Sequence, residues 1–446
     1  MNVADLENKV AAGEIDTVVT VFPDVFGRLV GKRFTAETFL REVAAHGTHA
    51  CNYLLTLNIE MDPQDGFALA NWEKGFGDFE LRPDFDSLRL LPWEAGAVMV
   101  LCDLHHDNGD RVSEAPRTVL RAQIARLNAL GFTCKLASEL EFFLFNQTFH
   151  DVSERGFRDL TPSSDYRIDY HTMQTARDEP IMRAIRNQMP LARVPIESTK
   201  GEWGRGQHEA NFIYDEPIPI ADLHAVFKQG AKQIAEQHGK SITFMAKPWA
   251  EEVGSSCHIH LSLWQGGRNL FAEGTEGSEL FRHFLAGLIR FSRELSYFTA
   301  PTVNAYKRYQ SASWAPTKMA WAHDNRTVGF RVVGHGASFR IENRMPGADA
   351  NPYLAFAAMI AAGLAGVEAK LECPPLYAGN AYVDSSLPRL PASLSEAAEL
   401  LHGSECAREA FGADVVGFYV HTARLEAEAF QNAVTDWERA RYFERI

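Results

Sequence analysis

Positive charge is scarce in this sequence, which has 44 lysines and arginines against 58 aspartates and glutamates and a formal net charge of −14. No block of basic residues stands out. We therefore expect neither nucleic acid nor an anionic membrane as a partner, because both are bound by clustered cations. The six cysteines have no Cys-x-x-Cys spacing. This scatter indicates reduced thiols in a cytoplasmic protein and argues against a disulfide framework or a zinc site.

Long apolar runs are also lacking. The most apolar stretch, "NPYLAFAAMIAAGLAGVEAKL", is mostly alanine and glycine and is short for a membrane span, which needs ~20 predominantly apolar residues. Asn351 as N-cap and Pro352 in the first turn predict a buried helix instead. The first residues, "MNVADLENKVAAGEIDT", are charged and helix-like, unlike a signal peptide. With 46% apolar residues, the chain of 446 can bury a large core.

The order of predicted elements gives an α+β fold in two domains, residues 1–105 and 106–446. The first domain has a helix at 5–12 and then short strands separated by turns. In the second domain, apolar periodicity predicts strands mixed with helices. The predicted strands are 138–145, 208–213, 257–264, 328–333 and 338–343, and the predicted helices are 180–189, 220–238, 278–294, 352–371, 393–402 and 418–443.

The stretch "KLASELEFFLF" (135–145) places two glutamates, Glu139 and Glu141, two residues apart in an apolar run. On a strand, residues i and i+2 point to the same face, so the two carboxylates would lie side by side. Like charges this close repel and raise each other's pKa, so the arrangement calls for a cation.

Three further segments repeat the pattern of polar residues on one strand face: "ESTKGEWGRGQHEANF", "GSSCHIHLSLW" and "FRIENRMP". Carboxylates with a single histidine suit Mg²⁺ or Mn²⁺, and arginines suit carboxylate or phosphate. A solvated sheet face explains any one of these sets equally well. Four sets in apolar or glycine-rich surroundings favour a metal and phosphate site, although spacing alone does not show that they meet.

Six segments, in order and over nearly the whole chain, resemble the glutamine synthetase family, type I-like: "SELEFFLF", "GEWGRGQHEANF", "EEVGSSCHIHLSL", "NAYKR", "NRTVGFR" and "FRIENRMPGADANPYLAFA". The resemblance implies an N-terminal β-grasp domain and a catalytic domain with a curved antiparallel sheet and helices. It also implies a homo-oligomer, commonly a dodecamer of two stacked hexameric rings, in which the N-terminal domain of one subunit closes the active site of the next.

The resemblance also implies roles for individual residues. The proposed ligands of two to three Mg²⁺ or Mn²⁺ ions are Glu141, Glu202 and Glu209 for one ion and Glu139, His258 and Glu342 for a second, which also holds the ATP phosphates. The clamp on the substrate glutamate would be Arg308 and Arg344, backed by Gly254. The phosphate and nucleotide contacts would be Arg326, Arg331, Arg340, Glu197, His260 and Ser262, with Arg326 and Arg308 catalytic.

The sequence departs from ammonia-using members near "NAYKRYQSASWAPT". These members carry a glutamate just before the Ala-Pro, and here the position is Trp314. Tyr170 matches the tyrosine of the family's ammonia pocket, but "HGTHACNYLLT" has no aspartate where those members have an Asp-Gly-Ser-Ser loop. At pH 7 only about one alkylamine molecule in 2,500 is neutral. An ammonium pocket offsets that cost with carboxylates, whereas tryptophan adds an apolar face and cation–π attraction.

We therefore expect an ATP-dependent ligase that joins the γ-carboxylate of L-glutamate to a small organic amine through γ-glutamyl phosphate. The alternatives are a glutamine synthetase that uses ammonia and a non-catalytic scaffold of the same family. Plain core packing or a subunit contact is the alternative interpretation of Trp314. The roles of several further residues remain open at this point. His49 or Glu202 would be the proton acceptor, Glu60, Asp62 and Asp65 would contact a polyamine, and Tyr382 would be a regulatory tyrosine. Val253 stands where ammonia-using members usually have asparagine.

Overall fold

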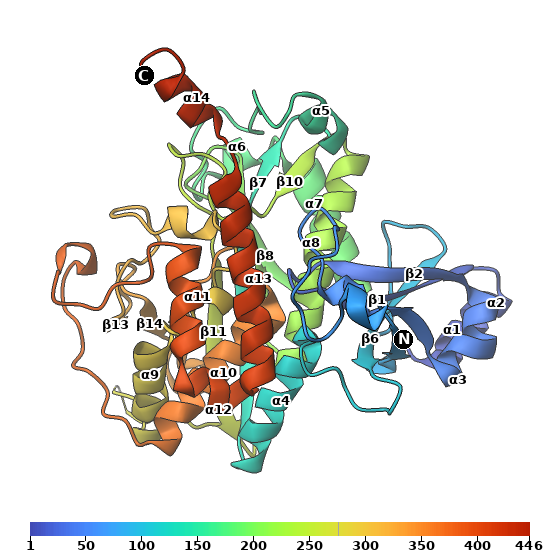
Figure 1. Ribbon diagram of the computed structural model, residues 1–446, viewed down its shortest axis with the longest axis horizontal. Helices are drawn as coiled ribbons and strands as arrows, with labels where there is room; N and C mark the ends of the chain where they lie inside the picture. Colours follow the sequence, from blue (N-terminus) through green and yellow to red (C-terminus); the bar gives the residue numbers. More distant parts are fainter. Residues whose placement is uncertain (275) are drawn as a thin grey trace.

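The computed structural model describes residues 1–274 and 276–446. In Figure 1 the N-terminal part (blue) forms a small sheet that projects from one side of a larger body, and the C-terminal helix α14 (red) projects from the top. The fold is α+β, as predicted, with two separate sheets. The division into domains at 105/106 remains a prediction, although the smaller sheet ends at His105 with β6.

The smaller sheet has the strand order β2-β1-β6-β4-β3, with β5 paired to β6. β1 and β6 run parallel and the other pairs are antiparallel. One face carries a small core of its own, in which Leu6 of α1 packs with Val18, Phe39 and Val98, while the other face joins the main core. The bounds are α1 Val3–Ala11, β1 Thr17–Pro23, β2 Leu29–Thr35, β3 Thr48–Cys51, β4 Asp78–Pro83, β5 Arg89–Leu90 and β6 Ala97–His105.

The larger sheet has the order β13-β14-β15-β11-β7-β9-β8, with β10 paired to β7 and β12 to β11. Its pairs are antiparallel except β13 and β14, which are parallel at the edge. The bounds are β7 Thr133–Phe145, β8 Ile196–Gly201, β9 Gln207–Phe212, β10 Ser241–Thr243, β11 Cys257–Gln265, β12 Arg268–Asn269, β13 Trp321–His323, β14 Phe330–Val333 and β15 Arg340–Asn343. The five strands predicted for this region are all present.

Helices pack on the apolar face of the larger sheet and on one another. In α10 the side chain of Asn351 accepts from the backbone N–H of Tyr353, which confirms the predicted N-cap. Residues 418–443, predicted as one helix, belong to α13 and α14, because the chain is extended at Ala433 and Thr435 begins a new helix with a capping box. The bounds are α4 Pro116–Ala129, α7 Glu179–Gln188, α8 Pro217–Gln237, α9 Glu279–Phe291, α10 Pro352–Glu368, α11 Leu394–Gly403, α12 Glu405–Phe411, α13 Ala413–Asn432 and α14 Asp436–Tyr442.

Across residues 1–274 and 276–446, no helix combines the length and the apolar character that a membrane crossing requires. α10, the most apolar of them, is 17 residues long and lies in the core between α4 and α9.

Candidate active site

Strand register brings the predicted metal ligands onto one face of the larger sheet. Glu139 on β7 stands opposite His258 on β11, and Glu141 stands opposite Glu209 on β9. Farther across the sheet, Glu342 on β15 stands opposite both His260 and Arg331. Because alternate residues of a strand point to opposite faces, the buried Leu140 points into the core while its neighbours line the polar face.

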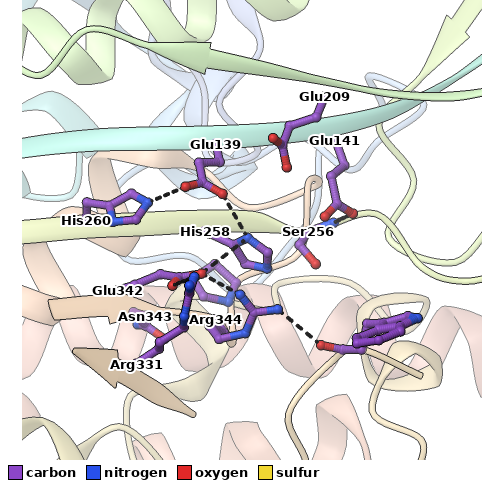
Figure 2. A network of polar contacts seen from close by, with 12 residues as sticks. Glu139, Glu141, Glu209, Ser256, His258, His260, Arg331, Glu342, Asn343 and Arg344 are labelled. Carbon is purple, nitrogen blue, oxygen red and sulfur yellow. Dashed lines mark hydrogen bonds and ion pairs between the residues drawn. The ribbon is translucent and has the colours of Figure 1, made fainter. Parts of the chain in front are cut away.

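The first group of ligand atoms is formed by Glu139, His258 and Glu342, which lie within 4.8 Å of one another. Nδ1 of His258 is 3.3 Å from Glu139 and 3.6 Å from Glu342, as Figure 2 shows. Burial and then the Arg344 charge lower the pKa of His258, so its ring is held neutral, which is the form that binds metal ions. These three residues were grouped from the sequence, and the structure brings them together.

The second group contains Glu141 and Glu209 with the same His258, again within 4.8 Å. Burial and then the charge of Glu202 raise the pKa of Glu141 to about 8 and that of Glu209 to about 9. Glu202, predicted as the third ligand, lines the same cavity but is ion-paired to the Nζ of Lys200. The predicted set is therefore only partly assembled, because a lysine that the sequence argument did not consider holds one of its members.

Glu139 and Glu141 have opposite electrostatic surroundings although they are two residues apart. Burial opposes ionisation of Glu139, but hydrogen bonds with His258 and His260 outweigh burial and lower its pKa. Among residues 1–274 and 276–446, the hydrogen bonds that Glu141 accepts come from neutral donors, the backbone N–H of Ser256 (2.7 Å) and the side chain of Gln207 (3.3 Å). The protein itself stabilises the charge of Glu139, whereas ionised Glu141 requires a further cation.

The arginines divide into those that line the cavity and one that lies beneath it. Arg344 lines it and donates to Glu342 at 2.5 Å, and Arg331 donates to the other oxygen of Glu342 at 2.8 Å. Burial opposes ionisation of Glu342, but the charge of Arg344, followed by the effects of His258 and His260, outweighs burial and lowers the pKa of Glu342 to about 2. Arg326 also lines the cavity, as does Gly254.

Arg308, predicted as part of the clamp on the substrate glutamate, lies behind the loop that carries Arg344. Its guanidinium is buried and donates to three backbone carbonyls, those of Arg344 (3.0 Å), Met345 (2.8 Å) and Pro346 (3.0 Å). Arg308 is not among the residues that line the cavity. In this structure it supports the loop that carries Arg344, so its place is that of a positioning residue.

Two adjoining cavities cover the polar face. The first, of about 730 Å³, is lined by every metal-ligand candidate except the fully buried Glu342, by Gly254 and Arg344 of the residues predicted for glutamate, and by both residues predicted for the amine. The second, of about 420 Å³, is lined by the predicted nucleotide residues Glu197, His260, Ser262 and Arg340. Glu139, Glu197 and Asn211 line both cavities, so a ligand can extend from one to the other. Lys135, missed from the sequence, lies in the second cavity between the rings of Tyr214 (5.0 Å) and Trp264 (4.3 Å).

Part of the lining of the first cavity is aromatic. Trp314 and Tyr170 line it and are 50% and 72% exposed in the single chain. Both have a left-handed backbone, with φ of 65° and 54°, a conformation that costs about 1–3 kcal/mol and is concentrated at functional sites. Trp203, also missed from the sequence, contacts Trp314 edge to face with ring centroids 5.7 Å apart.

The remaining candidates are two residues near the first cavity and four residues of the N-terminal part. Val253 lines the cavity beside Gly254. The Tyr382 hydroxyl donates to the carbonyl of Ala315 at 2.9 Å and so holds the Trp314 loop, which leaves it poorly placed for modification. The acidic and histidine candidates of the N-terminal part do not line the cavity of their own chain: His49, Glu60, Asp62 and Asp65.

Comparison with known proteins fits this geometry. The profile of the glutamine synthetase catalytic domain matches residues 113–442. The chain belongs to the glutamine synthetase family. Enzymes of this family use ATP and divalent metal ions, and the carboxylate and imidazole donors described above suit such ions.

Two relatives within the glutamine synthetase family have names that specify an amine. A gamma-glutamylethanolamide synthetase of Streptomyces coelicolor is 51% identical over 447 residues, which cover 100% of this chain and 96% of the relative. A glutamate–isopropylamine ligase of a Pseudomonas species is 39% identical over 439 residues, covering 97% of this chain and 96% of the relative. A solved structure titled as a GmaS/ADP complex superposes with a TM-score of 0.86 at 28% identity and covers 99% of both chains.

Proposed function

We propose that this protein is an ATP-dependent ligase that joins the γ-carboxylate of L-glutamate to a small organic amine, ethanolamine first among the candidates. The observation that carries the proposal is the aromatic lining of the cavity, in which Trp314 contacts Trp203 and to which Tyr170 also contributes. An aromatic wall stabilises an organic substituent and contributes little to a bare ammonium ion. The names of the two relatives, 51% and 39% identical to this chain, specify synthesis of gamma-glutamylethanolamide and ligation of glutamate to isopropylamine.

The reaction has two steps. The γ-carboxylate of glutamate attacks the γ-phosphorus of ATP and ADP leaves; the amine nitrogen then attacks the acyl carbon, phosphate leaves, and the nitrogen gives up a proton. Bound divalent ions would neutralise charge on the transferring phosphoryl group. The proposed ligands are Glu139, His258 and Glu342 for one ion and Glu141, Glu209 and Glu202 for another, with Glu202 exchanging Lys200 for metal.

The chain's own cations serve the same transfer. Arg326 and Arg331 line the first cavity and are proposed to contact phosphate, while Arg340 and its neighbours in the second cavity hold the nucleotide. Arg344, backed by Gly254, is proposed to bind a carboxylate of glutamate, and Arg308 keeps its loop in place. Such prearranged cations stabilise developing charge without having to reorganise during the step.

Assembly and location complete the proposal. We propose that the protein is a homo-oligomer, a dodecamer of two hexameric rings, in the cytoplasm. Its support is a set of exposed apolar side chains on the projecting C-terminal segment, where Trp437 is 62%, Phe443 90% and Ile446 94% exposed. All six cysteines are free thiols, in keeping with a reducing compartment. The mass of the protein in solution tests the assembly.

The decisive experiment measures phosphate release and product mass with ATP, L-glutamate and Mg²⁺ or Mn²⁺, against ammonium, methylamine, isopropylamine, ethanolamine, putrescine, spermine and aniline. We expect kcat/KM for one organic amine to exceed that for ammonium by at least about tenfold, the factor that a methylene group in an apolar pocket provides. An E342Q variant, which lacks one proposed metal ligand, is the inactive control. Highest turnover with ammonium would identify a glutamine synthetase instead, and no turnover with any amine would favour a scaffold.

A further inference from the structure

Asp169, which the sequence analysis did not single out, lines the first cavity directly before Tyr170. Tyr170 is 72% exposed and the Asp169 side chain is 34% exposed in the single chain. The Asp169 carboxylate lies 3.8 Å from the Nζ of Lys200, which extends from β8. Asp169 is not a member of either metal-ligand group. This carboxylate therefore remains available for a ligand when metal ions are bound.

Lys200 shows which kind of ligand this wall accepts. A lysine side chain ends as a primary alkylammonium, the same chemical group as a protonated primary amine. Its Nζ lies 4.5 Å from the centre of the Tyr170 ring and is ion-paired to Glu202. An ammonium group is thus held between a carboxylate wall and an aromatic face, the arrangement that favours alkylammonium binding.

Metal binding would separate the Lys200 ammonium from the carboxylates that are proposed to bind metal. Lys200 is also 3.9 Å from Glu209, so two of its three carboxylate partners are proposed metal ligands. A divalent ion on those carboxylates repels the lysine ammonium and competes for the same oxygens. Asp169 and Tyr170 then remain as an anionic and an aromatic group in the cavity that Trp203 and Trp314 also line.

From this arrangement we infer that Asp169 determines specificity for the amine: its carboxylate binds the ammonium group of a primary alkylamine on the Tyr170 face, and Trp203 and Trp314 pack against the substituent. The inference rests on the proposed function and names the residue that replaces, for an organic amine, the carboxylate absent at position 314. Asp169 touches the substrate before the amine attacks, so its effect is on amine binding and not on phosphoryl transfer.

The test compares D169N with the wild type in steady-state kinetics. We expect the KM for the preferred alkylamine to rise about tenfold, the effect of losing a partly desolvated charge partner, while the KM values for ATP and glutamate change less than about twofold. Hydroxylamine, which is largely unprotonated near neutral pH, needs no anionic partner, so its conversion to the hydroxamate should be unchanged. D169E should recover part of the alkylamine affinity.

The matched control is D165N, because Asp165 is an exposed aspartate of the same segment that does not line the cavity. An equal loss with hydroxylamine and alkylamine would overturn the inference in favour of a structural role, and so would an unchanged alkylamine KM in D169N. The proposed function is tested separately with the wild type, and it is wrong if the wild type prefers ammonium to every organic amine.

Discussion

At the scale of single residues, we propose that the side chain at position 314 sets the choice between ammonia and an organic amine. We predict that W314E lowers the ratio of kcat/KM for the organic amine to kcat/KM for ammonium by at least about tenfold. The glutamate removes an apolar wall worth about 1–3 kcal/mol per methylene contacted and adds a carboxylate that attracts ammonium. The measurement is the pair of kcat/KM values in one phosphate-release assay.

The matched control for this prediction is W314F, which keeps an aromatic face. It should hold the ratio of kcat/KM values within about threefold of the wild type, because a smaller aromatic ring at a half-exposed site loses little contact with the amine. If W314E and W314F change the ratio equally, size and not charge is what matters. If neither changes it, Trp314 is a packing or subunit-contact residue, the alternative that the sequence left open.

Single residues also show how far the site could be predicted from sequence. Glu139, His258 and Glu342 were grouped correctly because the glutamine synthetase motifs fix them and the strand register brings them together. The sequence did not show that the carbonyls of residues 344–346 turn inward to accept hydrogen bonds from Arg308, whose role on the substrate glutamate stays a prediction. Asp169 was missed because it lies in a loop without periodicity.

At the scale of elements, the close contact of α9 and α10 depends on glycines. A Cβ at Gly287 would stand 2.1 Å from the carbonyl oxygen of Ala362 and 2.7 Å from the nitrogen of Gly366, both backbone atoms. The helices would have to separate, so we predict that G287A lowers the free energy of unfolding by about 1–3 kcal/mol or more. Urea unfolding followed by circular dichroism measures this loss.

G417A is the matched control, because Gly417 lies on the exposed side of α13 with nothing within 4 Å of an added Cβ. There alanine should stabilise by about 0.5–1 kcal/mol, its ordinary advantage over glycine in a helix. Equal changes in the two variants would show that helix propensity, and not the contact of α9 with α10, governs both positions.

Elements were the part of the fold most accessible to sequence reasoning. Apolar periodicity located β7, β9 and β11 because these strands alternate between core and cavity. The break between α13 and α14 was missed, since Val434 and the residues around it carry no proline or glycine to mark it. The order of strands in the sheet is set by contacts between distant segments, so no local pattern predicted it.

At the scale of the whole molecule, stability should depend on pH in a direction set by the buried carboxyls. The pKa values of Glu141 and Glu209 are raised to about 8 and about 9 by burial and by Glu202, against an ordinary value of 4.5. Between about pH 5 and 9 the folded protein therefore binds more protons than the unfolded chain, and stability falls as pH rises, by at most about 1.4 kcal/mol per pH unit for each group. We predict that the melting temperature of metal-free protein declines from pH 6 to pH 9.

Divalent ions should reverse this decline, because they bind the ionised carboxylates and release the protons. Mg²⁺ or Mn²⁺ at 100 times its Kd adds about 2.7 kcal/mol to the free energy of unfolding. The metal affinity grows as the carboxyls ionise. The gain in melting temperature at a fixed ion concentration should therefore be larger at pH 9 than at pH 6. Differential scanning calorimetry with EDTA and with each ion measures both trends.

E209Q provides the comparison. Because it lacks one of the two carboxyls with a raised pKa, it should lose less stability over the same pH range and gain less from metal. A metal-induced gain that is the same at every pH, or identical in E209Q, would mean that the ions bind elsewhere than at the Glu141 and Glu209 carboxylates.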